Sequence, residues 1–546
     1  MGNEKAKMLI DRLERLQSIR SNWDRIWDFI AKRTSPKNAC FTTEPQIGQP
    51  QSAWQKYDST ASLAINKWAS AMDGLTTPKT QTWHGLALTD TNLSEKYKDY
   101  LEEVRDILFA RRYAATSNFA NANYENLRSV GTFGNGAFSL TESKDLRGNV
   151  YKAWDLREFF IEQNFEGQID VFFRKFKLTA RQARQEFGEN CPDKVKNAKN
   201  LQDEFDFLWA VYPNTDYDKN SILATKKKYA SVYVCITTCE LIEESGYDIC
   251  PLFYQRYDIM PSLTDPYGYA PILLCMPEVR DLNKMVADLL TLSNRQTQPN
   301  YLASEDDLIE RRFLNNGILI QGGLDSNGNE RVKELISHAQ TPITLEMIQD
   351  FRQVINEGFN LNLFQILVNK PNMTATEVMQ RAQEQGTLLG SFTSRREKEF
   401  LSPLIVKEVE LAERQGDLPP VPEELAEALG SGEVFFSIKY ESPIVRAQKA
   451  DEGTAIMRTL ETAAALQNFD PTVKNKINAV ETLKAVAQIW GAPQKIFNTD
   501  EEKEVKDMNE AQLQQAEQML NAAPIISKSA KDMADAQAKG GVGGIL

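Results

Sequence analysis

The residues that most often carry enzyme chemistry are few in this chain of 546 residues, and they lie far apart. His84 and His338 are its two histidines, and neither has the other nearby, which favours a structural role for His84 over acid–base catalysis. Paired carboxylates occur at 243–244 and 306–307, but adjacent acids on a strand point to opposite faces, and those on a helix are usually solvated. The sequence therefore predicts no catalytic residue.

Six cysteines are the next candidates, at positions 40, 191, 235, 239, 250 and 275. Cys235, Cys239 and Cys250 are close enough in sequence to suggest a metal site, but no paired CxxC motif occurs and both histidines are distant. Buried, reduced thiols on strands are the favoured interpretation for a chain of this length. We predict neither a bound metal nor a cofactor.

Two further segments suggest contact with phosphates. The glycine-rich run 131–138, GTFGNGAF, lacks the Walker and GxGxxG spacings, and a strand predicted at 137–141 stands where a nucleotide-binding fold needs a helix. A turn between a helix and a strand explains it better. In the segment 171–182, four basic residues alternate with phenylalanines: Arg174, Lys175, Lys177 and Arg181. This alternation favours the solvated face of a strand over a nucleic-acid patch.

Composition and charge limit the remaining classes of protein. A formal net charge of −13 argues against a protein whose whole surface grips DNA, because phosphate binding needs clustered lysines and arginines. It is compatible with a surface past which DNA slides. The chain has no run of about 18 apolar residues for a membrane span, and its first residues lack the apolar core of a secretory signal, so we expect assembly in a cytoplasm.

Two long amphipathic helices organise the chain. The first is predicted from Pro277 to about residue 298, and the second from Thr341, as its N-cap, to about Gly358. Apolar residues recur at steps of three and four: Val279, Leu282, Val286 and Leu289 in the first helix, and Met347, Phe351 and Val354 in the second. Such narrow apolar stripes require neighbouring helices.

Other patterns flank this pair. The insert at 301–341 is predicted to hold a strand at 317–321, a polar loop spans 363–373, and a capping box at 374–377 restarts a helix that Pro403 kinks or breaks. Mixed helices and strands, with a turn near Ser245 and Gly246, occupy 58–260. A strand is predicted at 434–440, and helices at 447–467, 471–490 and 501–522.

The N-terminal helix, predicted at 4–33, has one apolar face: Leu9, Leu13, Leu16, Trp23, Trp27 and Ile30. Packing on its own domain is the favoured interpretation. A contact with another subunit is the alternative for its two tryptophans.

Several phrases of the sequence resemble the head-to-tail connecting proteins, or portal proteins, of short-tailed double-stranded DNA bacteriophages. The main ones are YGYAPI at 267–272 running into PEVRDLN at 277–283, and MTATEV at 373–378 running into EFLSPL at 399–404. Segments 76–88, 131–138 and 171–182 add to the similarity, which runs discontinuously from about residue 58 to 415. None of these phrases is catalytic, and their order and spacing carry the resemblance.

This resemblance implies an α+β fold: a portal-type subunit with a mixed α/β wing, a two-helix stem, a small β-containing clip and a C-terminal helical crown, assembled as a ring. It implies the following boundaries: N-terminal helix and extended arm 1–57, wing 58–276, stem helix 277–300, clip 301–341, stem helix 342–362, tunnel loop 363–373, wing return 374–445, and crown with flexible tail 446–546.

By the same resemblance, the ring is a dodecamer at one capsid vertex of the virion, through which double-stranded genomic DNA enters during packaging and leaves during ejection. The implied partners are the large terminase, a tail adaptor, the major capsid protein and the scaffold, with no membrane. Asn369, Lys370 and Asn372 of the tunnel loop are implied to approach the DNA backbone; the alternative for Lys370 is an ion pair with a neighbouring subunit. A minor capsid or scaffold protein without a channel, or a packaging or lysis enzyme, is the alternative function.

Overall fold

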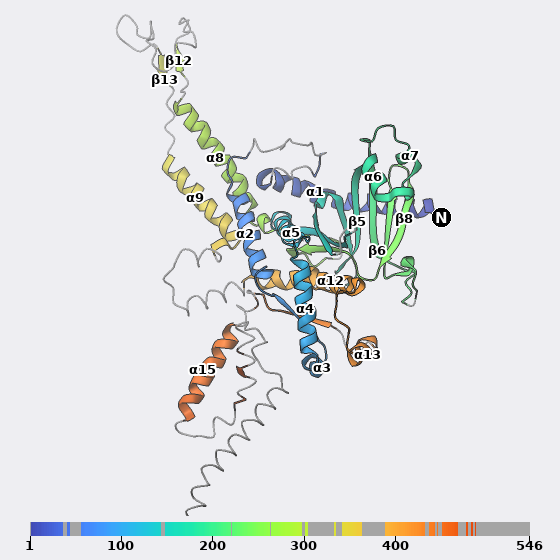
Figure 1. Ribbon diagram of the computed structural model, residues 1–546. Helices are drawn as coiled ribbons and strands as arrows, with labels where there is room; N and C mark the ends of the chain where they lie inside the picture. The colour runs from blue at the N-terminus through green and yellow to red at the C-terminus, as the bar shows by residue number, and fades with distance from the viewer. Residues whose placement is uncertain are drawn as a thin grey trace, which may run out of the picture. The chain divides into compact units, whose positions relative to one another are not determined.

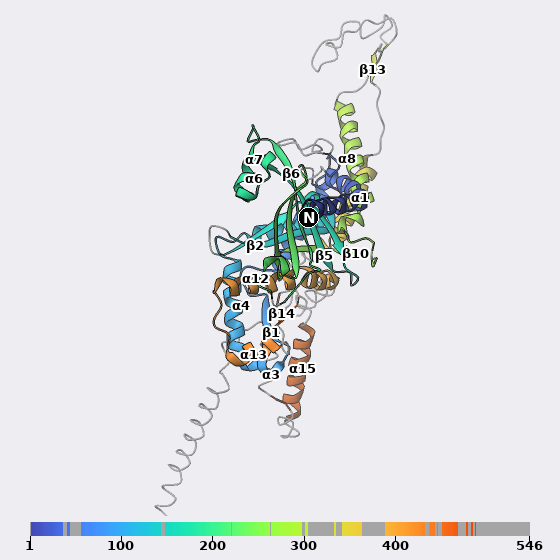
Figure 2. The ribbon, with the colours of Figure 1, turned by 90° about the vertical axis from the view of Figure 1, so that its right-hand side faces the viewer.

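In the computed structural model the chain divides into two units, Met1–Gln448 and Lys449–Leu546, and each is considered by itself. The structure describes residues 2–35, 41–43, 56–143, 148–219, 221–262, 264–297, 301–303, 332–334, 341–362, 388–431, 436–442, 445, 450–467, 477–478, 482–483 and 486. Within these ranges, no helix is both long enough and apolar enough to cross a membrane. Figures 1 and 2 show helices packed around antiparallel sheets in the first unit.

The largest sheet has five strands, all antiparallel to their neighbours. In spatial order they are β4 (Phe159–Gln163), β5 (Ile169–Thr179), β6 (Glu204–Pro213), β7 (Tyr229–Cys235) and β8 (Glu240–Tyr247). Helices α6 (Ala180–Phe187) and α7 (Asp193–Lys196) connect β5 to β6, and a reciprocal capping box between Thr179 and Gln182 begins α6.

The turn predicted near Ser245 and Gly246 is wrong, because both residues belong to β8. A Cβ atom at Gly246 would lie 2.3 Å from the carbonyl oxygen of Ala224. Gly246 therefore lets β8 lie close to the backbone at Ala224. Close approach of another backbone is a known reason for glycine within a strand.

Helix α1 (Gly2–Thr34) covers one face of this sheet, and all six of its predicted apolar residues are buried. The prediction that it packs on its own domain is confirmed, since Leu9, Leu13 and Leu16 pack against Phe173 and other sheet residues. Phe172 and Phe176 of β5 enter the main core on the opposite face.

Because both faces of β5 are covered, the expectation of a solvated basic face is wrong for Arg174. Its side chain is only 14% exposed, forms an ion pair with Glu158 at 2.9 Å, and lies over the ring of Trp154. This arginine is therefore part of the packing of the sheet rather than a free surface charge.

A three-stranded antiparallel sheet contains β3 (Asn149–Trp154), β2 (Asn135–Glu142) and β9 (Leu252–Arg256) in that order. It packs against α5 (Phe119–Phe133), which in turn packs against α2 (Thr60–Thr76). Gly134 caps α5 with a φ of 75°, and a Cβ there would lie 2.4 Å from the carbonyl carbon of Tyr269. The predicted turn between a helix and a strand is confirmed at this position, which requires glycine.

The strand predicted at 434–440 is present as β14 (Phe436–Tyr440) and pairs antiparallel with β1 (His84–Leu88). Beside it lie α3 (Thr91–Lys96), α4 (Lys98–Arg112), α12 (Ser402–Gln415) and α13 (Glu423–Ser431). Residues 388–396 are helical, and a π-helical turn at Glu397–Leu401 precedes α12. The helix predicted to kink or break at Pro403 is not broken there, but its α-helical ladder is interrupted by this π-helical turn, because proline supplies no N–H to continue it.

The remaining elements are small. Two short ladders pair β10 (Asp258–Ile259) with β11 (Gly268–Tyr269), and β12 (Tyr301–Ala303) with β13 (Val332–Glu334). Single 3-10 turns occur at Leu156–Glu158, Gly188–Asn190, Ala224–Lys226 and Pro271–Leu273. In the second unit, α15 (Ala450–Gln467) matches the helix predicted at 447–467.

Every strand pair among the described residues is antiparallel, so the α+β class is confirmed. Three predicted elements lie outside the described residues: the strand at 317–321, the capping box at 374–377 and the helix at 501–522. Of the helix predicted at 471–490, the structure describes only residues 477–478, 482–483 and 486.

Candidate functional site

The two helices that organise the sequence form an antiparallel hairpin in the structure. Helices α8 (Met276–Thr297) and α9 (Thr341–Gly358) pack side by side, and Figure 1 shows the short β12–β13 ladder beyond their distal ends. A 3-10 turn at Pro271–Leu273 leads into α8. We call this pair the stem.

The predicted apolar face of α8 is buried at its base. Val279 and Leu282 are fully buried, whereas Val286 and Leu289, further from the base, are partly buried against the same core. That core also contains Trp27 and Trp68 of the body, so the base of the stem and the body share one hydrophobic cluster.

The buried face of α9 is different from the predicted one. Ile348, Ile355 and Phe359 are buried, and Phe351 is partly buried, but Met347 and Val354 are 44% and 41% exposed. Both sets step by three, four or seven residues, so periodicity alone does not choose between them. Within the described part of the chain nothing covers Met347 and Val354 completely, and their role in packing the stem stays a prediction.

Polar contacts also hold the stem to the body. The side-chain oxygen of Asn283 accepts hydrogen bonds from the backbone N–H groups of Tyr57 and Asp58, at 3.0 and 3.2 Å. The Asp58 carboxylate accepts from the N–H of Thr60, at the start of α2, and from Arg352 of α9 at 2.8 Å. Burial opposes ionisation of Asp58, but these hydrogen bonds to Thr60 and Arg352 lower its pKa below the usual value.

Replacing Asp58 with asparagine is expected to reduce stability by about 1 kcal/mol at neutral pH, because Arg352 loses an ionic partner and is itself half exposed. The pKa of Asp58 is lower in the folded state than in the unfolded state, where it is about 3.9, so its ionised carboxylate stabilises the folded protein above about pH 3.9. This contribution disappears as the pH falls through the lower pKa of the folded state. Urea unfolding of wild type and Asp58→Asn should therefore differ at pH 7 and converge below about pH 4. A constant difference across this range would contradict the assignment.

A buried ionic cluster fixes α12 against the body. The Glu408 carboxylate accepts hydrogen bonds from Arg112 Nε at 2.9 Å and from the Tyr151 hydroxyl, and Arg112 Nη1 contacts His84 Nε2 at 2.8 Å. All four side chains are almost completely buried. Burial, and then the charge of Arg112, lower the pKa of His84, so the imidazole is neutral and its Nε2 accepts the hydrogen bond. This contact gives His84 a structural role.

Two more buried arginines connect the helical segment before α12 to the body by hydrogen bonds and an ion pair. Arg396 donates to Gln255 Oε1 at 2.7 Å and to Asn123 Oδ1 at 2.6 Å, and Arg256 pairs with Glu399 at 2.7 Å. The helix that follows the predicted tunnel loop is thus bound to the body at three points along its length.

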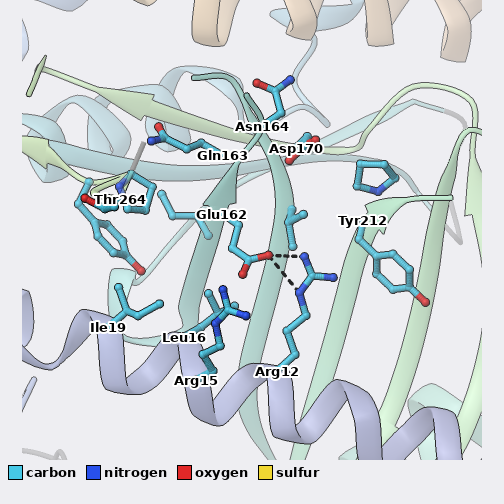
Figure 3. A pocket seen from close by; sticks show the side chains of 15 residues that line it. Arg12, Arg15, Leu16, Ile19, Glu162, Gln163, Asn164, Asp170, Tyr212 and Thr264 are labelled. Carbon is cyan, nitrogen blue, oxygen red and sulfur yellow. Dashed lines mark hydrogen bonds and ion pairs between the residues drawn. The ribbon is translucent and has the colours of Figure 1, made fainter. Parts of the chain in front are cut away.

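A groove of about 720 Å³ lies between α1 and one end of the five-stranded sheet. Figure 3 shows Arg12 of α1 reaching toward Glu162 of β4, and the two form an ion pair. Leu16, Ile161 and Val171 are among its apolar lining residues. The groove contains none of the residues predicted for the DNA-facing or stem sites.

The structure confirms the prediction of a buried thiol on a strand for Cys235 of β7 but not for Cys250, which is partly buried and precedes β9. Cys191, Cys235 and Cys275 are buried, but Cys239 is exposed after β7, with a φ of 56°. The buried-thiol interpretation is wrong for Cys239, because it stands in the turn between two strands. Across the described residues, no three metal-binding side chains come together. Asn369, Lys370 and Asn372 lie outside the described residues, so their roles stay predictions.

Comparisons of the sequence with known proteins identify related chains. The chain is 24% identical to the portal protein of Salmonella phage epsilon15, over 98% of this chain and 97% of that protein. It is also 24% identical to a probable portal protein of Bordetella phage BPP-1, over 89% of this chain and 87% of that protein. The model of the bacteriophage head to tail connecting protein family matches residues 6–497. The chain therefore belongs to the bacteriophage head to tail connecting protein family.

Proposed function

We propose that this chain is a portal subunit that assembles into a ring, a dodecamer, at one vertex of the capsid. Double-stranded DNA passes through the ring during packaging and ejection, and the large terminase and a tail adaptor dock on it in turn. The major capsid protein and the scaffold surround it during assembly in the host cytoplasm. In this proposal the protein is a structural component of the virion rather than an enzyme.

The observation that best supports the proposal is that large apolar side chains remain exposed on the stem. Other apolar residues of α8 and α9 are already buried, so these exposed ones are additional. Leu290 of α8 is 50% exposed, and Met347 and Val354 of α9 are exposed to a similar degree. A two-helix hairpin cannot cover these residues by itself, whereas identical hairpins arranged side by side around an axis can.

The mass of the purified protein tests this proposal directly. One subunit has a mass of 61.9 kDa, so native mass spectrometry should show one dominant species near twelve times this value. A monomer at all concentrations would favour the enzyme alternative. A heterogeneous or open assembly would favour a minor capsid or scaffold protein without a channel.

We further propose that Asn369, Lys370 and Asn372 face the DNA, with one lysine per subunit forming a ring of cations in an acidic channel. Lys370→Ala should leave the mass of the ring unchanged and reduce DNA packaging or retention, because transient phosphate contacts are lost. DNA content per particle is the measurement, and Lys370→Arg, which keeps the charge, is the control. A change in ring mass would favour the alternative ion pair between subunits.

A further inference from the structure

Two buried cysteines lie on the face of the five-stranded sheet that α1 does not cover. Cys235 ends β7, and its direct partner across the ladder is Phe207 of β6, so the two side chains lie on the same face. Cys191 lies between α6 and α7, in the connection that covers this face. Both cysteines are free and almost completely buried. Neither takes part in the contacts of the stem or of the buried ionic cluster.

Aromatic contacts fix how close this connection lies to β7. The ring of Phe187, the last residue of α6, has its centroid 5.4 Å from that of Phe207 and 5.5 Å from that of Tyr233. Tyr233 precedes Cys235 by two residues, so it points to the same face of β7. Cys191 follows Phe187 after a single 3-10 turn and is buried in the same hydrophobic cluster as Cys235. The connection therefore brings Cys191 to the end of β7.

Two cations lie close to Cys191. Burial has the largest effect and raises the pKa of this thiol, the charges of Lys196 and Arg184 lower it, and a charge on Cys235 raises it. The last effect requires the two sulfur atoms to be near each other. Arg184 Nη2 donates to two backbone oxygens of the connection, whereas its buried Nε has no hydrogen-bond partner among the described residues. Burial thus keeps the thiol protonated in the closed protein, and the two cations are placed to stabilise a thiolate when the connection opens.

The connection is a thin outer layer of the body. Helix α7 has four residues, and the side chains on either side of Cys191 are exposed, namely Glu189, Asn190, Asp193 and Lys194. Short surface elements with few buried contacts have the smallest free energies of local opening. A small oxidant therefore reaches Cys191 through local opening, without unfolding of the sheet.

We propose that Cys191 and Cys235 form a disulfide within each subunit after the particle leaves the reducing cytoplasm of its host. Two S–H bonds break and one S–S bond forms; the thiols release two protons and two electrons, which dioxygen takes up to become hydrogen peroxide. The bond closes a loop of about 44 residues and ties the connection to β7. The timing rests on the proposed function, because thiols stay reduced in a cytoplasm and oxidise outside it. The pairing of the two thiols does not rest on it.

Disulfide mapping of the purified full-length chain tests the pairing. The protein is held in air-saturated buffer, its remaining thiols are alkylated during denaturation, and its peptides are separated without reduction. We expect one cross-linked pair that joins the peptides of Cys191 and Cys235, with a mass about 2 Da below the sum of the free peptides. The same pair should form in Cys239→Ser, which removes the exposed thiol nearest to Cys235 in sequence. Free Cys191 and Cys235 after oxidation, or a bond from either to another cysteine, would overturn the proposal.

Proteolysis tests what the bond does. Trypsin cleavage after Lys194, an exposed residue of the connection, requires local opening. Oxidation of the wild type should slow this cleavage by about tenfold, because the closed covalent loop restricts the opened state. Cys191→Ala is the control, and its cleavage should proceed at the same rate in air and in reducing buffer. Equal rates in oxidised and reduced wild type would show that these thiols do not tie the connection to β7.

A glutathione buffer tests the timing. In a large excess of reduced glutathione, which imitates a cytoplasm, both thiols should stay free; a bond that persists there contradicts the timing. Native mass spectrometry of the same samples separates this inference from the proposed ring. A ring whose Cys191 and Cys235 stay unpaired in air leaves the proposed function standing and this inference wrong. A bonded pair in a protein that forms no ring refutes the proposed function and leaves the pairing in place.

Discussion

Replacing Glu408 with alanine is expected to lower the free energy of unfolding by about 3–5 kcal/mol. The reason is that Arg112 remains fully buried without its carboxylate, and an uncompensated buried charge is far more costly than the loss of a surface pair. The Tyr151 hydroxyl loses an acceptor at the same time. Chemical denaturation with tryptophan fluorescence gives the change, since Trp83 lies under the Arg112 guanidinium.

The matched control removes both charges. Arg112→Met with Glu408→Leu leaves neither partner buried alone, so the double variant should recover most of the stability lost by Glu408→Ala. A loss below about 1 kcal/mol for Glu408→Ala would show that this cluster does not anchor α12. The same loss in both variants would show that packing, rather than charge, is responsible.

The substitution Val286→Asp is expected to abolish ring assembly while leaving the body folded. Val286 is partly buried on α8, one turn further from the base than Leu282, and packs against the edge of the core that the stem shares with the body. A carboxylate at this partly buried position is costly unless it is hydrated, so the hairpin opens to admit water and the stem loses its shape. The protein should sediment as a folded monomer.

Val286→Ile is the control, because it keeps an apolar side chain in the seam and should assemble normally. Circular dichroism of the monomer checks that the body remains folded. Rings formed normally by Val286→Asp would contradict the placement of this residue in the seam and the role of the stem in assembly.

Periodicity predicted the local elements well where one face of a helix is buried. All six apolar positions of α1 are buried, and the starts of α8 and α9 fall within a residue of the predicted ones. Periodicity failed where a strand is covered on both faces, or where a helix has two sets of apolar residues that could be buried. On β5 both faces are covered, so Arg174 is packed rather than solvated, and on α9 two apolar sets compete for one seam.

The tertiary contacts had no signal in the sequence. Glu408 and Arg112 are 296 residues apart, and neither belongs to a recognisable motif. The alignment of the stem base, where Gly358 lies beside Cys275, is likewise a feature that only the folded hairpin provides.

The central claim is that the stems of identical subunits surround an opening. Electron microscopy of the purified protein, viewed along its symmetry axis, tests it most directly. The account predicts a closed ring with a central hole, in which each α8–α9 hairpin contacts the hairpins of two neighbours. A solitary globular particle without an opening, with both helices covered by their own chain, would contradict it.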